Sequence, residues 1–169
     1  VTPWLKASAY AMVGSWKWKN SGSAITYDNY SGETLKETKI SCDGLHVGDA
    51  PQTQLGAQLD AKLPEGLYAH VGWQFNARMY ADFEPSSRTD EKDTADSYEF
   101  PSYSLFDATV GWETEITKGI HLNLFATARN LFDAKYIERG TDGKTHDIDS
   151  FRGYWGAART MSVGMRLSF

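Results

Sequence analysis

The chain has 169 residues, enough for one domain, and its 17 Lys and Arg against 22 Asp and Glu give a formal net charge of −5. This mildly acidic balance argues against non-specific binding to nucleic acid. The mean hydropathy of −0.49, with no run of about 18 apolar residues, excludes a bundle of membrane helices. The same observation does not exclude a membrane β-barrel, because the apolar residues of its strands alternate with polar ones.

Alternation of apolar and polar residues predicts six strands along the chain. They cover residues 5–13, 53–61, 67–82, 105–114, 120–129 and 161–169. Met12 and Phe125 are the exceptions, since each places an apolar side chain on the polar face. The third strand alternates for about sixteen residues, against five or six in an ordinary globular strand. This length predicts a strand that crosses a membrane and continues beyond it.

The connections between these strands alternate in length. Residues 62–66 and 115–119 form short turns that contain glycine, whereas residues 82–101 and 133–155 form long polar loops. Another long connection, from about residue 16 to residue 50, is predicted to hold its own hairpin, with strands in "SAITYD" and "LKETKI". Short turns on one side and long loops on the other are typical of outer-membrane barrels.

The apolar face can meet either lipid or a core, and period two alone does not decide. Three features favour lipid. The apolar faces carry almost no charge, they use Ala freely, and aromatic residues such as Trp4, Trp112 and Phe169 stand towards the strand ends, where membrane interfaces lie. A soluble ligand-binding barrel of the lipocalin type is the alternative.

Four stretches carry a resemblance to a known family: "LHVGDAPQTQLG", "YADFEPSSRTD", "ARNLFDAKYIERG" and "FRGYWGAARTMSVGMRLSF". The whole chain, residues 1–169, resembles the C-terminal barrel portion of a TonB-dependent outer-membrane receptor of Gram-negative bacteria. The resemblance implies an all-β fold: an antiparallel transmembrane β-barrel segment that supplies the last six of 22 strands. The plug domain, the TonB box and the earlier strands lie outside this sequence.

The resemblance also implies a function. Such receptors are transporters in the cell outer membrane, not enzymes, and they take up scarce ligands with energy delivered by TonB. The ligand stays open among ferric siderophores for iron uptake, haem, cobalamin and glycans. The partners implied are outer-membrane lipid, the barrel-assembly machinery, the rest of the receptor with its plug, TonB and the ligand; nucleic acid is not among them. The alternative is a complete eight-stranded outer-membrane barrel that acts as an adhesin or membrane enzyme.

The chain ends on a strand whose last residue is aromatic. Its final residues resemble the C-terminal signal read by the barrel-assembly machinery, with Ser162, Gly164, Leu167 and Phe169 at the matching positions. The family pattern prefers an aromatic residue at the Leu167 position as well. A terminal aromatic side chain also suits anchoring at the membrane interface.

The barrel interpretation turns the polar strand faces into a lumen wall. The candidates for contact with plug or ligand are Tyr68, His70, Gln74, Asn76, Arg78, Tyr80, His121, Asn123 and Arg129. Each of them is also compatible with ordinary hydrogen bonding inside a lumen.

No catalytic motif is visible, and neither a metal site nor a cofactor is expected. The four histidines lack metal-ligand spacing, although the loop residues His46 and His146 are weak candidates for haem or metal ligation. The acidic run "TDEKDTAD" is expected to be a solvated loop, because Arg88 and Lys92 accompany its acids.

Overall fold

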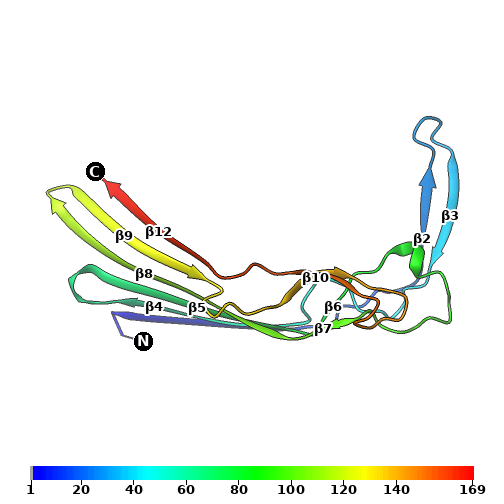
Figure 1. Ribbon diagram of the computed structural model, residues 1–169, viewed down its shortest axis with the longest axis horizontal. Coiled ribbons are helices and arrows are strands. Elements are labelled where there is room, and N and C mark those ends of the chain that lie inside the picture. Colours follow the sequence, from blue (N-terminus) through cyan, green and yellow to red (C-terminus); the bar gives the residue numbers. More distant parts are fainter. Residues whose placement is uncertain (1) are drawn as a thin grey trace.

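A computed structural model describes residues 2–169, and its regular secondary structure consists of antiparallel strands and two short 3-10 helices (Figure 1). Six strands form one sheet in the order β1-β4-β5-β8-β9-β12. They are β1 (Leu5–Val13), β4 (Thr53–Lys62), β5 (Leu67–Ala77), β8 (Tyr103–Thr117), β9 (Ile120–Arg129) and β12 (Thr160–Ser168). No helix among residues 2–169 is long and apolar enough to cross a membrane. The chain thus folds as a segment of β-barrel wall, as the sequence predicts.

The register of this sheet places like residues opposite one another. Leu55 faces Phe75, and Ala57 faces Trp73, so apolar side chains continue from strand to strand on one face. We call this the apolar face; its rows run Leu5, Ala61, Ala69, Val110, Ala126, Val163 and Ala7, Leu59, Val71, Ala108, Ala128, Met161. Polar residues occupy the other side, the polar face. The predicted period of two is confirmed in all six strands.

The two ends of the sheet differ, as the connection lengths predict. Both termini and both short turns lie at one end in Figure 1, and the long connections gather at the other. The β4–β5 turn contains the 3-10 helix η1 (Pro64–Gly66), and the β8–β9 turn uses Gly119 at φ +82°, a conformation that favours glycine. We call the long connections loop 1 (residues 14–52), loop 2 (78–102) and loop 3 (130–159).

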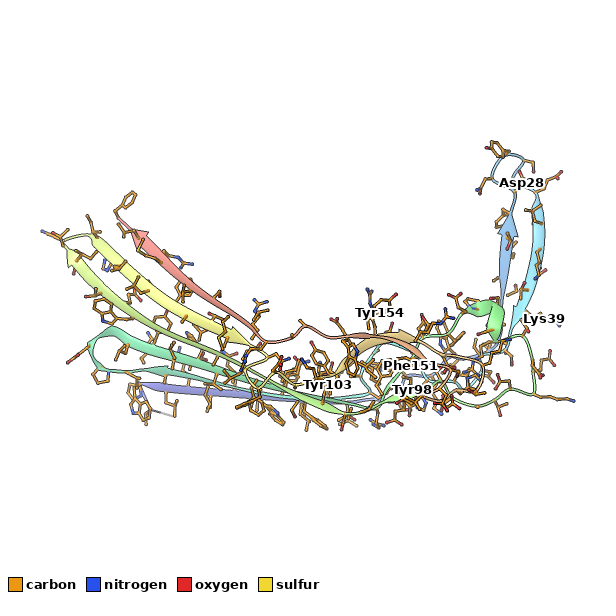
Figure 2. All side chains as sticks on the ribbon, viewed as in Figure 1. Asp28, Lys39, Tyr98, Tyr103, Phe151 and Tyr154 are labelled. Atoms are coloured by element: carbon orange, nitrogen blue, oxygen red, sulfur yellow. The ribbon has the colours of Figure 1, made fainter. Side chains whose placement is uncertain are left out.

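Loop 1 carries the predicted hairpin, formed by β2 (Gly22–Tyr27) and β3 (Thr34–Ile40). In Figure 2, Asp28 marks its tip and Lys39 its base. The two strands pair only with each other and stand away from the long sheet (Figure 1). Among residues 2–169 the outer strands β1 and β12 each pair on one side only, so the sheet is open. Six strands, rather than eight, therefore belong to the wall.

The prediction of an unbroken strand over residues 67–82 is wrong beyond Ala77. Arg78 adopts φ +52° and ends β5, and the next residues form β6 (Met79–Tyr80), which pairs with β7 (Glu99–Phe100) in loop 2. Met79 therefore does not extend the apolar face. Its side chain is buried in a loop core, because the backbone turn at Arg78 redirects the chain.

The buried core of the chain lies in the loops. One cluster joins Cys42, Leu45 and Phe83, and another joins Met79, Ala81 and Phe100, with Tyr98 and Phe151 packed against the second (Figure 2). Loop 2 also contains the 3-10 helix η2 (Pro85–Ser87), and loop 3 contains the pair β10 (Ile137–Thr141) and β11 (Arg152–Trp155). Cys42 is a buried free thiol.

The acidic run at residues 89–96 is mostly exposed, as expected, but Arg88, directly before it, is not. Its side chain is fully buried, although its position in a run of charged residues predicts exposure. The partners that compensate its charge come partly from loop 3, more than fifty residues away.

Candidate functional site

The polar face carries a row of charged groups near the short turns. Lys6, Asp60 and His70 stand opposite one another on β1, β4 and β5. His70 Nδ1 lies 2.5 Å from Asp60 Oδ1. A cavity of about 640 Å³ opens here, lined also by Tyr68 and Asn123. This end of the polar face is therefore a concave surface on which both charges and hydrogen-bonding groups are available.

The candidate residues on the strands form a wall rather than one cluster. The Tyr68 hydroxyl donates to Asn123 Oδ1 at 2.8 Å, and Gln74 donates its amide to Asn76 at 3.2 Å. His121 stands opposite Ser168, and Arg129 opposite Thr160, at the two ends of β9. Each of these positions lies on the polar face. Their contact with a plug or a ligand stays a prediction.

Arg78 and Tyr80 are engaged within the loops. Arg78 donates to the carbonyl oxygens of Gly14 and Gln52, at 2.9 and 3.1 Å, and to the Thr53 hydroxyl. It thereby fastens both ends of loop 1. The Tyr80 ring stacks on His46, with ring centroids 4.3 Å apart. Burial is the main cause that raises the pKa of Tyr80 above its ordinary value. The contact of either side chain with a plug or a ligand stays a prediction.

Aromatic rings on the polar face lie over glycines of the neighbouring strand. Tyr68 covers Gly111, and Phe125 covers Gly164; a Cβ on either glycine would overlap the ring. This explains why Phe125 breaks the polar pattern of its strand, because the flat ring packs along the sheet surface. Gly164 consequently has a packing role in addition to its place in the predicted assembly signal. Such pairs pin the register of a sheet.

The base of loop 3 is closed by Asn130. Its side chain donates to the carbonyl oxygens of Ala134 and Ala157, at 2.9 and 3.0 Å, and accepts from the Ala134 N–H at 2.8 Å. Its own N–H donates to Asp107 on β8. Asn130 is buried and has φ +48°, which Asn tolerates better than most residues. The Asn130 side chain thus links the two ends of loop 3, and its backbone N–H links them to the sheet.

Two further contacts complete this base. The Arg159 N–H donates to Asp133, and Tyr136 lies over Gly156, where a Cβ would overlap its ring. The Arg159 N–H and then the Lys135 ammonium hold the pKa of Asp133 below its ordinary value. The hydrogen bonds that Asp133 accepts from Arg159 and Lys135 therefore persist at neutral pH, and they weaken as the pH falls and Asp133 becomes protonated. The motifs "ARNLFDAKY" and "WGAART" therefore meet at the base of loop 3, a contact that the sequence alone does not predict.

The loop histidines are engaged with carboxylates. His46 Nδ1 lies 2.9 Å from Asp96, and both ring nitrogens of His146 contact aspartates. Within residues 2–169 no group of three or more His, Cys, Asp or Glu side chains is arranged to hold a metal ion.

Comparison with known proteins gives structural similarity at low sequence identity. No known family model matches the chain, and no curated protein matches it. The chain is similar in structure to the siderophore receptor PiuA from Acinetobacter baumannii, with a TM-score of 0.62 and 17% identity. It is also similar to the ferric-catecholate import receptor Fiu from Escherichia coli K12, with a TM-score of 0.58 and 14% identity. Both similar proteins are receptors, PiuA for a siderophore and Fiu for the import of ferric catecholates.

Both similarities cover 99% of this chain but only 20% of PiuA and 19% of Fiu. The chain thus spans about a fifth of the length of these receptors. At such identity the similarity shows the fold: this chain has the architecture of one sector of a receptor barrel.

Proposed function

We propose that the chain is the C-terminal sector of a TonB-dependent outer-membrane receptor that imports a ferric siderophore. The observation that carries this proposal is the open six-stranded sheet with one continuous apolar face, which matches siderophore receptors over 99% of the chain. An exposed apolar face of this size suits a lipid boundary, since soluble monomers rarely expose so large a patch. Val163, for example, is 86% exposed.

The remaining partners follow from the open edges and the polar face. The edges of β1 and β12 would pair with earlier strands, so that 22 strands close around a plug that contacts the polar face. Energy would come from TonB through the plug, and the barrel-assembly machinery would read the terminal strand. The strand length also agrees with this placement, since β4, β5 and β9 contain ten or eleven residues and a spanning strand needs about 9–11.

The test is ligand uptake in cells that lack the full-length protein. Uptake of iron from at least one ferric siderophore should fall in the deletion strain, return with the complementing gene, and disappear when TonB is removed. Haem, cobalamin and glycan uptake are measured in parallel. Unchanged uptake of every ferric siderophore, with loss of one of the other ligands, would replace the siderophore assignment while retaining the receptor.

A further inference from the structure

The strand pair of loop 3, β10 with β11, has two unlike faces. Gly140 and Gly153 stand opposite each other, and the Phe151 ring lies where a Cβ on either glycine would be. Phe151 in turn packs against the rings of Tyr98 and Phe100 in the second loop core. This face of the strand pair is therefore fixed to the loops, and the opposite face is held in a defined position.

The opposite face displays two arginines and a tyrosine. Arg139 stands opposite Tyr154. Thr141 stands opposite Arg152, so the four side chains share one face. The Arg139 guanidinium lies 5.1 Å from the centre of the Tyr154 ring, which is a cation–π contact. Tyr154 is 63% exposed, and in Figure 2 it lies on the side towards which the sheet curves, away from Phe151.

A cavity adjoins this face of the strand pair. Its volume of about 750 Å³ falls within the range of about 300–1,000 Å³ that small-molecule sites have. Lys144, Arg152 and Tyr154 line it, and Thr141 adds a hydroxyl group. In a closed barrel the concave side of the sheet faces the interior, so this cavity would open towards the path of an entering ligand.

The cations of this surface have no acidic partner. Seven ion pairs are formed among residues 2–169, and none of them involves Arg139, Lys144 or Arg152. All three side chains are exposed. Their guanidinium and ammonium groups are therefore available to an anion from solution.

Two acidic residues border the cavity, Asp142 and Glu84. The charge of Asp142 is compensated by Arg88, whose Nη2 lies 2.9 Å from its Oδ2. Glu84 is then the one acid of the cavity that forms no ion pair within residues 2–169. Three free cations against one free carboxylate leave the surface positive, although the whole chain carries a formal charge of −5. Such a local excess of positive charge attracts anions.

We propose that Arg139, Lys144, Arg152 and Tyr154 form a binding surface for an anionic ferric siderophore, one that holds its iron through catecholate oxygens. The inference rests on the proposed function and names the class of siderophore. A ferric tris-catecholate is multiply anionic and exposes aromatic rings. The cations donate charge-assisted hydrogen bonds to its oxygens, and the tyrosine ring packs against its rings. A ferric hydroxamate of the ferrichrome type is neutral and lacks these rings, so it should bind less well.

The experiment is equilibrium binding to the full-length protein in detergent micelles. The probes are ferric enterobactin, an anionic tris-catecholate, and ferrichrome, a neutral tris-hydroxamate. The wild type should bind ferric enterobactin more tightly than ferrichrome. Its affinity for ferric enterobactin should fall as the ionic strength rises, because salt screens the attraction between exposed charges.

Two lysines of loop 3 provide a matched pair of variants. Lys144→Gln removes a cation that lines the cavity, and it should weaken binding of ferric enterobactin roughly tenfold, as the loss of one hydrogen bond to a charged group does. Lys135→Gln is the control, because this exposed lysine pairs with Asp133 outside the cavity. It should leave the affinity unchanged. Glu84→Gln removes the opposing charge and should tighten binding roughly two- to fivefold.

All three substitutions lie at exposed positions, so the variants should assemble normally, which heat-modifiable mobility verifies. An unchanged affinity in Lys144→Gln, or an equal loss in Lys135→Gln, would overturn the proposal. Binding of ferrichrome without ferric enterobactin would overturn it too, while the siderophore receptor would stand. Binding of neither probe would also reject the surface, and the uptake assay with other siderophores then decides separately whether the proposed function fails.

Discussion

The sheet leaves its apolar side chains exposed, whereas loops 1 to 3 bury side chains in cores of their own. In the sheet, apolar residues such as Met161 and Val163 are 69% and 86% exposed, and no other part of residues 2–169 covers them. In the loops, Ala81, Gln52 and Arg88 are 0% exposed. The loops thus carry their own core, whereas the sheet depends on what surrounds it. Lipid on one face and further strands at both edges would supply what the sheet lacks.

The largest expected effect concerns the chain on its own. Residues 1–169 alone should not form a closed, stable barrel, because the smallest bacterial membrane barrels use eight strands. In hydrocarbon each unpaired backbone group of an open edge costs several kcal/mol, and an edge carries about ten residues. This cost exceeds a typical folding stability of about 5–15 kcal/mol.

Refolding of the isolated chain into detergent micelles checks this expectation. The readouts are heat-modifiable mobility on gels and resistance to protease. A monodisperse, protease-resistant and heat-modifiable monomer would show that the segment closes without other strands.

A charge on the apolar face should have the next largest effect. Val71→Arg in the full-length protein should cost roughly 2–4 kcal/mol near the membrane midplane, because Arg at that depth loses its hydration. Gln74→Arg, on the polar face of the same strand, is the control and should cost much less. The fraction of heat-modifiable protein, measured against denaturant, compares the two. Equal losses at both positions would remove the distinction between the faces.

Removal of the Asn130 side chain should loosen loop 3 without opening the sheet. Asn130→Ala leaves the carbonyls of Ala134 and Ala157 and the Ala134 N–H without their partner. These groups are only partly buried, so the loss of the three hydrogen bonds should lower the local stability of loop 3 by roughly 1–3 kcal/mol in total. Hydrogen exchange of residues 131–158 measures the change. Asn29→Ala, in the exposed turn between β2 and β3, is the control, and an unchanged loop 3 in Asn130→Ala would contradict the assignment.

The smallest expected effect separates two glycines of the polar face. Gly164→Ala places a methyl group into the Phe125 ring and should cost about 1–3 kcal/mol, as overpacking does. Gly72→Ala meets nothing within 4 Å and should change stability by less than about 0.5 kcal/mol. Thermal loss of heat-modifiable mobility in the full-length protein ranks the two variants. A larger loss for Gly72→Ala would show that the ring contact is not the constraint.

The sequence was informative where one rule governs many residues. Period two predicts all six strands of the sheet, because each apolar side chain must lie on the same face as the one two positions away. The rule does not predict the break at Arg78, because Met79 and Ala81 continue the alternation although they are buried in the loops. The rule does not predict the burial of Arg88 either, because that burial depends on contacts with Asp142 and His146, which only the fold brings near. The positions of the strand candidates on the polar face, from Tyr68 to Arg129, followed from alternation, whereas contact with a plug or a ligand does not follow from alternation and stays a prediction.

The most direct test of the account is single-cysteine labelling on neighbouring strands of the full-length protein in membranes. Leu59 and Val71 stand opposite each other on the apolar face, and Gln58 and Gly72 stand opposite each other on the polar face. Cysteines at Gln58 and Gly72 should react with a water-soluble reagent, and cysteines at Leu59 and Val71 only with a lipid-soluble one. Equal reaction of both sets with the water-soluble reagent would contradict the barrel wall.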